Sequence, residues 1–258
     1  MKIKEILKTN NNDLIELLKY VLKKENIYSI KEDKLTLGEK ELFKKLKKKL
    51  LNNMPIEYIT KKAYFYKSEF MVNRDVLIPR TETETIIPYL LQYKNLIDIG
   101  CGSGAVGISI KKENPNINVV LSDISKKALN IAKINIGNLD IKLIQSDLTS
   151  KINLENTDCI FANLPYIKDK ELLPQSVFKY EPHIALFGGK DGLFYIKNLI
   201  LELHNKKWRG SLFLEMDDVQ IKKINIKKTI IKDQFGFNRF IKIDYPILPF
   251  NIDMAFCN

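Results

Sequence analysis

From Asn95 onward, short apolar runs alternate with helical patterns, and this alternation limits the fold more than any other feature of the chain. Apolar runs of strand length occupy residues 96–99, 118–123, 142–144, 159–162 and 211–215. Helical patterns lie between them, at residues 105–112, 125–135 and 192–204. Two final runs, residues 228–232 and 237–243, are close enough in sequence to pair as a hairpin. The pattern predicts the α/β class, with a doubly wound parallel sheet and an antiparallel C-terminal hairpin.

The N-terminal part of the chain has a helical pattern instead. Apolar stripes at helical spacing recur through the first 54 residues. We expect Asp13 to cap one of these helices, and Thr36 with Glu39 has the spacing of a capping box before another. None of these positions carries chemistry, so residues 1–54 are predicted to form a small helical domain.

Between these two parts the pattern changes to short β-type runs, which predict a hairpin-like linker. The runs are Tyr58–Ile59, Tyr64–Tyr66, Phe70–Val72 and Val76–Ile78. We therefore predict three parts: a helical domain at 1–54, a β-hairpin linker at 55–84 and the main α/β domain at 85–258.

The composition excludes several classes of protein. No apolar run reaches the roughly 18 residues that a membrane-spanning helix needs. The first residues lack the apolar core of an export signal. Cysteines stand far apart at Cys101, Cys159 and Cys257, and the two histidines, His183 and His204, give no zinc-binding spacing. We expect a reduced, metal-free protein of the cytoplasm, or of an organelle matrix if the source is eukaryotic.

The net charge of +11 invites a nucleic-acid interpretation. However, only four of the 42 basic residues are Arg, the side chain that contacts phosphates and guanines in a bidentate way. The lysines are spread along the chain, and the densest run, residues 44–49, lies on a helical pattern as its solvated face. The charge therefore does not require a nucleic-acid partner.

A glycine-rich turn follows the first strand of the alternating region. Asp98 lies near the end of that strand, and glycines then occupy every second position. The turn consists of Gly100, Cys101, Gly102, Ser103 and Gly104. Such glycines let the chain turn sharply and let a ligand lie against bare backbone. The spacing matches neither the dinucleotide fingerprint nor a phosphate loop.

Asp123 ends the next strand, where a carboxylate can accept hydrogen bonds from both hydroxyl groups of a ribose. Together with the glycine turn it indicates a cofactor with an adenosine and an amino-acid tail, and S-adenosylmethionine is the best candidate. Two plainer interpretations stay open: Asp98 could be only a cap, and Cys101 a small space-filling residue without a neighbouring base.

A further polar segment, Asn163-Leu164-Pro165-Tyr166, follows the buried strand at residues 159–162. The side-chain oxygen of Asn163 and the backbone carbonyl of Leu164 could together grip a planar NH2 group, with Tyr166 covering its flat face. Taken alone, such a segment is more often a strand-to-loop turn.

These segments, taken together, resemble the release factor glutamine methyltransferases, which methylate the side-chain amide of the glutamine in a Gly-Gly-Gln motif. The resemblance runs from about Pro55 to Arg239. The stretches that carry it are Pro55–Ile59, Val76–Arg80 with Glu82–Glu84, Asp98–Gly104, Ser122–Ser125, Ser146–Leu148, Asn163–Tyr166, Tyr180–Pro182, Gly188–Leu193 and Asp233 with Arg239. It implies a Rossmann-like methyltransferase sheet and an S-adenosylmethionine-dependent enzyme.

The resemblance also implies roles for individual residues. Gly100 to Gly104 would line the methionine part of the cofactor, Asp123 would hold the ribose, and Asp147 and Leu148 would flank the adenine. Asn163 to Tyr166 would bind the glutamine, with Asn163 also near the cofactor. The partner would be a peptide-chain release factor; we expect a monomer that needs neither nucleic acid nor a membrane. The chain departs from the family at Thr81 and Leu164, where Pro is usual, and at Asp217, where Gly is usual.

Two alternatives remain at this point. A nucleic-acid methyltransferase acting on the exocyclic amine of adenine or guanine would use the same grip, and the net charge favours it. A non-catalytic binding module that has kept the cofactor fold is a second possibility, motivated by the residues at 81 and 164.

Overall fold

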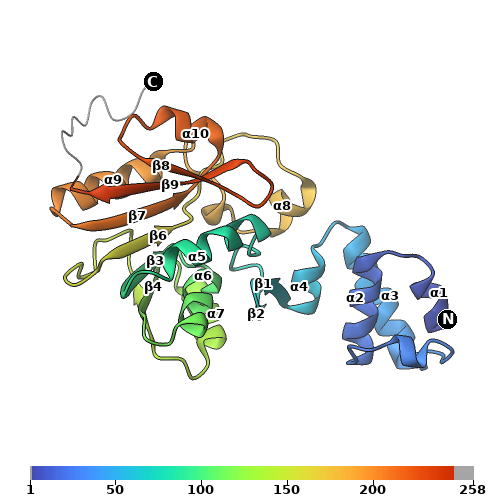
Figure 1. Cartoon of the computed structure of the whole chain (residues 1–258). Helices are drawn as coiled ribbons and strands as arrows, with labels where there is room; N and C mark the ends of the chain where they lie inside the picture. Colours follow the sequence, from blue (N-terminus) through green and yellow to red (C-terminus); the bar gives the residue numbers. More distant parts are fainter. Residues whose placement is uncertain (1, 247–258) are drawn as a thin grey trace. The chain divides into compact units, whose positions relative to one another are not determined.

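The structure is a computed structural model that describes residues 2–246 (Figure 1). Residues 247–258, Cys257 among them, lie outside this range. The chain divides into two compact units. The smaller consists of Met1–Lys62 and Leu173–Tyr180, and the larger of Ala63–Leu172 and Glu181–Asn258. The division at residues 54 and 84 stays a prediction.

The smaller unit is helical. Its elements are α1 (Ile3–Leu7), α2 (Asn12–Leu22), the 3-10 helix η1 (Tyr28–Ile30), α3 (Leu37–Leu51), α4 (Ile56–Thr60) and α8 (Gln175–Tyr180). The capping box of Thr36 and Glu39 is present at the start of α3, as predicted. The predicted cap at Asp13 is wrong, because Asn11 accepts the hydrogen bond from Leu14 N (3.0 Å) and Asp13 lies in the first turn of α2.

The segment at Tyr58–Ile59 is also helical, not a strand as predicted. Pro55 stands at the N-cap of α4, and Ile59 packs into the apolar core of the helical unit. A helix of five residues is too short to show the 3.6-residue period, so two adjacent apolar residues were compatible with either structure. The Tyr180 hydroxyl donates to Asn52 O (2.9 Å), which attaches α8 to the same unit.

The larger unit contains a seven-stranded sheet in the order β5-β4-β3-β6-β7-β9-β8. Its strands are β3 (Asn95–Ile99), β4 (Asn118–Asp123), β5 (Ile141–Gln145), β6 (Cys159–Ala162), β7 (Gly210–Glu215), β8 (Thr229–Lys232) and β9 (Asn238–Tyr245). The first five are parallel, and β9 is antiparallel to both β7 and β8. The predicted doubly wound α/β sheet with an antiparallel C-terminal hairpin is confirmed.

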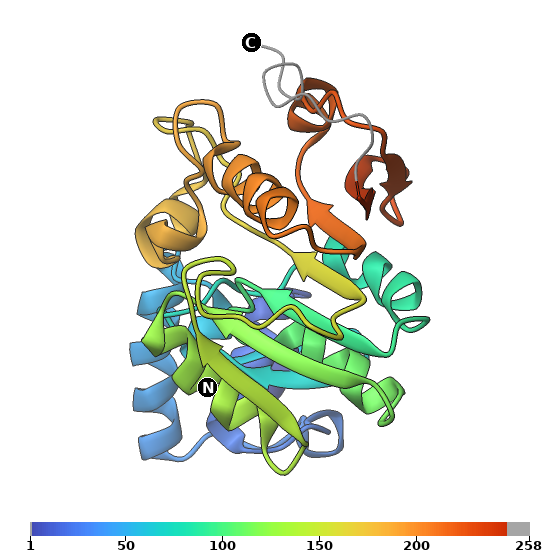
Figure 2. The same cartoon turned by 90° about the vertical axis from the view of Figure 1, so that its left-hand side faces the viewer.

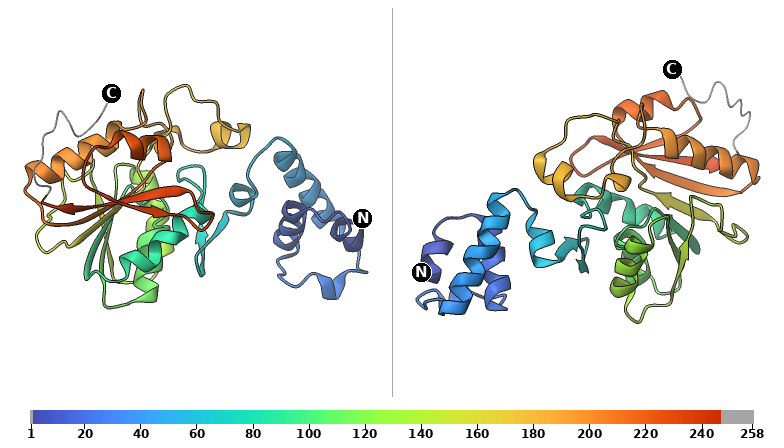
Figure 3. Two further views of the ribbon diagram at one scale, coloured as in Figure 1. Left: turned by 45° about the horizontal axis from the view of Figure 1, so that its top comes forward. Right: turned by 180° about the vertical axis from the view of Figure 1, so that it is seen from behind.

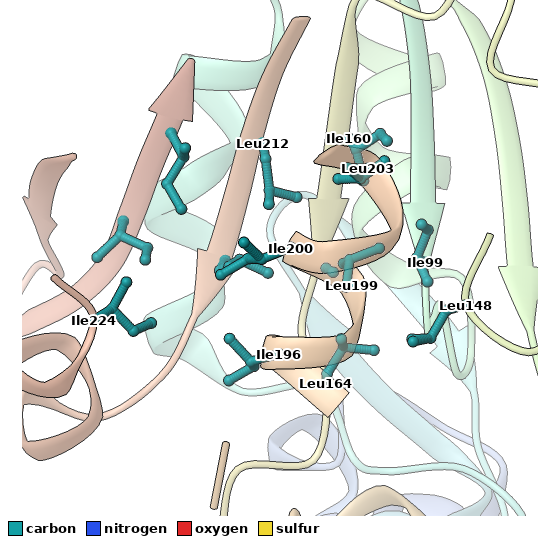
Figure 4. Packing of buried hydrophobic residues seen from close by; sticks show 14 of the residues in the cluster. Ile99, Leu148, Ile160, Leu164, Ile196, Leu199, Ile200, Leu203, Leu212 and Ile224 are labelled. Carbon is teal, nitrogen blue, oxygen red and sulfur yellow. The ribbon is translucent and has the colours of Figure 1, made fainter. Parts of the chain in front are cut away.

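Helices cover both faces of this sheet (Figures 2 and 3). The helices of the larger unit are α5 (Ile87–Leu90), α6 (Ala105–Glu113), α7 (Lys126–Ile136), α9 (Phe194–Asn205) and α10 (Asp218–Lys223). Two separate apolar cores result: α5, α6 and α7 share one with the sheet, and α9 and α10 share the other. In Figure 4, Ile196, Leu199, Ile200 and Leu203 of α9 lie beside residues of the strands. No helix within residues 2–246 has the length and apolar character needed to cross a membrane.

A small hairpin precedes the sheet. It pairs β1 (Lys62–Phe65) with β2 (Ser68–Met71), as the runs at Tyr64–Tyr66 and Phe70–Val72 predicted. The run at Val76–Ile78 forms no strand, contrary to prediction. Val76 and Ile78 are buried outside any strand, so their alternation reflects tertiary packing. Two 3-10 helices, η2 (Thr81–Ile86) and η3 (His183–Ala185), complete the larger unit.

Candidate functional site

The carboxyl ends of β3, β4 and β6 border a pocket in the larger unit, at the edge of the sheet where ligands bind in open α/β folds. The predicted site residues that line it are Gly100, Cys101, Gly102, Ser103, Asp123, Asp147, Leu148, Asn163, Leu164 and Pro165. Gly104 and Tyr166 lie outside the lining. The glycine turn, the acidic strand end and the Asn163 segment thus face one cavity.

Glycines shape the turn between β3 and α6. Gly100, Gly102 and Gly104 all have a positive φ, of 72°, 55° and 81°, which strains any other residue. A Cβ on Gly102 would meet no atom within 4 Å, so bare backbone faces open space. A Cβ on Gly104 would lie 2.8 Å from Ile108 Cδ1 and 2.9 Å from Leu121 Cδ1. Gly104 therefore serves the close packing of α6 on the sheet.

Two carboxylates stand where β3 and β4 end. Asp98 is buried, and its Oδ2 accepts from Gly107 N–H in the first turn of α6 (3.0 Å). Asp123 accepts from Gly102 N–H (2.9 Å) and Ser125 N–H (2.8 Å) through its two oxygens. Burial raises the pKa of both carboxyl groups, and that of Asp98 reaches about 7. Both carboxylates line the pocket: Asp98 caps the first turn of α6, and Asp123 is held by the backbone of the turns that follow β3 and β4.

The remaining cofactor-side residues suit an adenosine-containing ligand. Leu148 has a φ of 42° and is buried at the pocket wall, next to Asp147. Ile124 adds a second apolar side chain to the lining. Bare backbone at the turn, a carboxylate at the strand end and two aliphatic side chains match the amino-acid tail, ribose and adenine of S-adenosylmethionine, so the residues fit this cofactor.

Cys101 does not have the environment of a nucleophile. Its side chain is buried, and burial raises the pKa of the thiol well above its usual value. Asp98 and Asp123 raise it further by their negative charge. The thiol stays protonated, which agrees with the interpretation of Cys101 as a space-filling residue. Among residues 2–246, no group of three or more His, Cys, Asp or Glu side chains could hold a metal ion.

The Asn163 segment begins where β6 ends. Asn163 is half-buried at the pocket wall, whereas the side chain of Leu164 is buried in the core that α9 covers (Figure 4). The Leu164 carbonyl accepts no hydrogen bond from any residue that the structure describes. Leu164 Cδ2 would lie 3.2 Å from a Cβ on Gly100, so the segment and the glycine turn are in close contact. The leucine that replaces the family's proline is a packing residue.

A second glycine-rich loop supports this segment from behind. A Cβ on Gly188 would lie 2.2 Å from Pro165 O, and one on Gly192 would lie 2.2 Å from Tyr166 O. Gln220 of α10 donates to the same Tyr166 carbonyl (2.9 Å). Only glycine allows the two loops to approach so closely. This close approach explains the glycines in the stretch from Gly188 to Leu193.

Tyr166 lies behind the pocket in a charged cluster. Its hydroxyl interacts with Arg239, and burial raises its pKa, so it remains protonated. Arg239 pairs with Asp217 (Nη1 to Oδ1, 2.9 Å) and with the buried Asp233 (Nε to Oδ2, 3.3 Å). Asp217, another departure from the family pattern, thus forms an ion pair that glycine cannot form.

Glu215 is a site residue that the sequence analysis missed. It ends β7 and is buried, and its Oε2 accepts from the Thr83 hydroxyl (2.7 Å). Asn163, which follows the neighbouring strand β6, lies beside it and favours its ionised form. Burial raises the pKa of Glu215 to about 7. The sequence did contain a signal for this residue, because Glu215 is an acidic residue at the end of a buried strand, as Asp123 is.

Arg80 and Glu181 connect two loops at the mouth of the pocket. Arg80 Nη2 lies 2.7 Å and 2.8 Å from the two oxygens of Glu181, whose side chain is buried. Pro79 and Arg80 line the pocket from one loop, and Ile184 and Ala185 line it from the other. The ion pair therefore holds two walls of the cavity together.

Comparisons with known proteins identify the fold and the family. A family model described as "Methyltransferase small domain" matches residues 59–180. The solved structure of the hMettl16 catalytic domain in complex with MAT2A 3'UTR hairpin 6 is similar with a TM-score of 0.51 and 16% identity, over 68% of this chain and 75% of that one. This likeness concerns the fold alone, which is the Rossmann-like fold of S-adenosylmethionine-dependent methyltransferases.

Curated relatives give a finer assignment. A release factor glutamine methyltransferase of Clostridium acetobutylicum is 36% identical, over 77% of this chain and 80% of the relative. One of Streptococcus pneumoniae is 33% identical, over 84% and 85% of the two chains. A bifunctional methyltransferase of Rickettsia typhi is 32% identical over 93% of this chain, which spans only 54% of that relative. At these identities and over these lengths, the chain belongs to the family of the release factor glutamine methyltransferases.

Proposed function

We propose that this methyltransferase transfers a methyl group from S-adenosylmethionine to the side-chain amide nitrogen of the glutamine in the Gly-Gly-Gln motif of peptide-chain release factors. The observation that carries the proposal is the position of Asn163 and Leu164, which follow β6, line the pocket and lie against the glycine turn. The names of the family's curated members support the same substrate.

In this reaction the protein mainly has to position the substrate amide. Its nitrogen is a poor nucleophile because the lone pair is delocalised into the carbonyl. In our proposal Asn163 Oδ1 and Leu164 O accept the two N–H bonds, which favours a pyramidal nitrogen and aims its lone pair into the pocket. S-adenosylmethionine supplies the electrophilic methyl group. The amide proton is acidic once transfer has occurred, so no strong general base is required.

The surrounding residues would keep this arrangement rigid and dry. Pro165 restricts the backbone of Leu164 and so directs its carbonyl. Gly188 and Gly192 press the second loop against the back of the segment. Asp123, Asp147 and Leu148 would hold the ribose and adenine on the other side of the glycine turn, as expected from the family.

The substrate class is testable with labelled cofactor. We expect label in a purified release factor, none in the same factor with its motif glutamine changed to glutamate, and none in bulk RNA or DNA. Label in the glutamate form would refute the proposed acceptor atom, and label in nucleic acid would favour the exocyclic-amine alternative. Family membership leaves that alternative second.

A further inference from the structure

The carboxylate of Glu215 lies next to the proposed acceptor residue. β6 and β7 are parallel neighbours, with Ala162 opposite Leu214. Asn163 and Glu215 are the next residues on the two strands, so they end side by side at the carboxyl edge of the sheet. Glu215 is only 2% exposed. A fully buried carboxylate needs partners that donate hydrogen bonds.

Two polar side chains lie next to it. Thr83, itself buried in η2, donates its hydroxyl hydrogen to Glu215 Oε2 (2.7 Å). Asn163, which follows the neighbouring strand β6, also favours the ionised form of the carboxylate. Thr83, Asn163 and Glu215 thus come together from three segments that are far apart in sequence. Glu215 is the neighbour of Asn163 on β7.

The position of Glu215 bears on which end of the Asn163 amide faces the substrate. An asparagine amide has a donor end and an acceptor end of nearly the same shape. Only its oxygen can receive an N–H bond of a substrate amide. An ionised carboxylate only accepts, so it attracts the NH2 end of Asn163 and turns Oδ1 the other way.

We propose, resting on the function proposed above, that Glu215 is a positioning residue, which accepts from the Asn163 NH2 group and thereby presents Asn163 Oδ1 to the substrate amide. Thr83 assists by holding the carboxylate in place. Glu215 does not touch the reacting atoms. Its effect on methyl transfer passes through the orientation of Asn163.

The role requires Glu215 to be ionised. A protonated Glu215 could donate to Asn163 Oδ1, which would turn the NH2 end toward the N–H bonds of the substrate. The charged and titratable neighbours of Glu215 are Arg239, which stabilises the carboxylate, and Glu82, which destabilises it. The Tyr166 hydroxyl and Asp217 also lie in this cluster. Because burial raises the pKa of Glu215 to about 7, methyl transfer should fall as the pH drops below neutrality.

The test compares Glu215→Gln with the unaltered chain in steady-state transfer to a release factor between pH 5.5 and 9. A glutamine can meet Asn163 with either end, so it no longer selects one orientation. We expect kcat at pH 8 to fall about 10- to 100-fold, less than the roughly 100- to 1000-fold for loss of a preorganised group that contacts the substrate itself. Cofactor affinity, measured by calorimetry, should stay within about twofold, and the acidic limb of the rate profile near pH 7 should disappear.

Asp158→Asn is the matched control. Asp158 accepts from the backbone N–H groups of Lys94 (3.1 Å) and Asn95 (2.9 Å), just before the amino end of β6 and away from the pocket. The same loss of charge there should leave the acidic limb in place.

Thr83→Val keeps the test decisive if Glu215→Gln fails to fold. Removal of one donor should move the acidic limb upward by about half a pH unit to one unit, whereas Thr83→Ser should leave it in place. Unchanged kcat and an unchanged limb in a folded Glu215→Gln, or an unmoved limb in Thr83→Val, would overturn the role of Glu215 while the proposed function stands. If the unaltered chain transfers no label to the release factor, the proposed function itself is wrong, and this role falls with it.

Discussion

The pocket has two halves, and a buried carboxylate stands beside each one, held in a different way. On the cofactor side Asp98 accepts from a backbone N–H, that of Gly107, nine residues along the chain. On the acceptor side Glu215 accepts from the Thr83 hydroxyl and lies beside Asn163. Burial raises the pKa of both groups to about 7. The environments are equally dry, but one is built from local backbone and the other from distant side chains.

This difference predicts how each half responds to substitution. The cofactor side depends on a backbone path that glycines make possible and on carboxylates that stabilise it. The acceptor side depends on the direction of a few polar groups, which many residues from separate segments fix. Side-chain changes should therefore reduce methyl transfer most on the acceptor side and affect cofactor binding or stability most on the cofactor side.

Asn163→Ala should have the largest effect on catalysis. It removes one of the two proposed acceptors, and loss of such a preorganised group costs about 2.7–4 kcal/mol, or roughly 100- to 1000-fold in kcat. Cofactor affinity should stay within a few-fold, because Asp123 and the glycine turn are untouched. Single-turnover transfer and calorimetry measure the two quantities. The exposed Asn116 provides the control variant, Asn116→Ala, and full activity of Asn163→Ala would end the assignment.

Asp98→Asn should act on stability and its pH dependence. The folded-state pKa of Asp98 is raised to about 7, so its carboxyl contributes stability below pH 4 that is lost as the pH rises toward 7. The unaltered chain should lose on the order of 3 kcal/mol more unfolding free energy than Asp98→Asn between pH 4 and 7.5. Urea unfolding at several pH values measures this. Parallel curves for the two proteins would show that Asp98 is not desolvated.

Gly188→Ala should disturb the backbone that supports the acceptor segment. The new Cβ would lie 2.2 Å from Pro165 O, so either the second loop or the acceptor segment must move. We expect a loss of about 1–3 kcal/mol in stability and a lower kcat, with cofactor affinity retained. Gly38→Ala is the control, since a Cβ there meets nothing within 4 Å. A fully active Gly188→Ala would indicate that the segment tolerates displacement.

Asp123→Asn should affect the cofactor side alone. An asparagine NH2 would face one of the backbone N–H groups of Gly102 and Ser125 that now donate to the carboxylate. The cofactor Kd should rise about tenfold, the effect of roughly one lost charge-assisted hydrogen bond, while kcat at saturating cofactor changes little. Asp140→Asn, at an exposed position, serves as the control. A change confined to kcat would remove the distinction between the halves.

The sequence predicted the structure best where the signal lies within a few neighbouring residues. The glycine turn, the capping box of Thr36 and Glu39 and the C-terminal hairpin are all of this kind. Where short apolar pairs such as Tyr58–Ile59 lacked a period, the prediction of a strand was wrong, since a single helical turn gives the same pattern. The same holds for Val76–Ile78, which are buried by tertiary packing and not by strand pairing.

The acceptor side illustrates what local pattern cannot give. Thr83 and Glu215 are 132 residues apart, and nothing in either neighbourhood indicates that they are partners. The contact of Asp217 with Arg239 is likewise absent from the usual family pattern and depends on how β9 pairs with β7. The sequence identifies the individual polar groups. Only the folded structure shows which of them are partners.

The central claim is that Asn163 and Leu164 present a glutamine amide to the cofactor. Mass spectrometry of a release factor, after incubation with S-adenosylmethionine and either the unaltered chain or Asn163→Ala, tests it most directly. We expect a single added methyl group on the amide nitrogen of the Gly-Gly-Gln glutamine, formed by the unaltered chain and reduced at least about 100-fold by the variant. Methylation at any other atom, or equal methylation by both proteins, would contradict it.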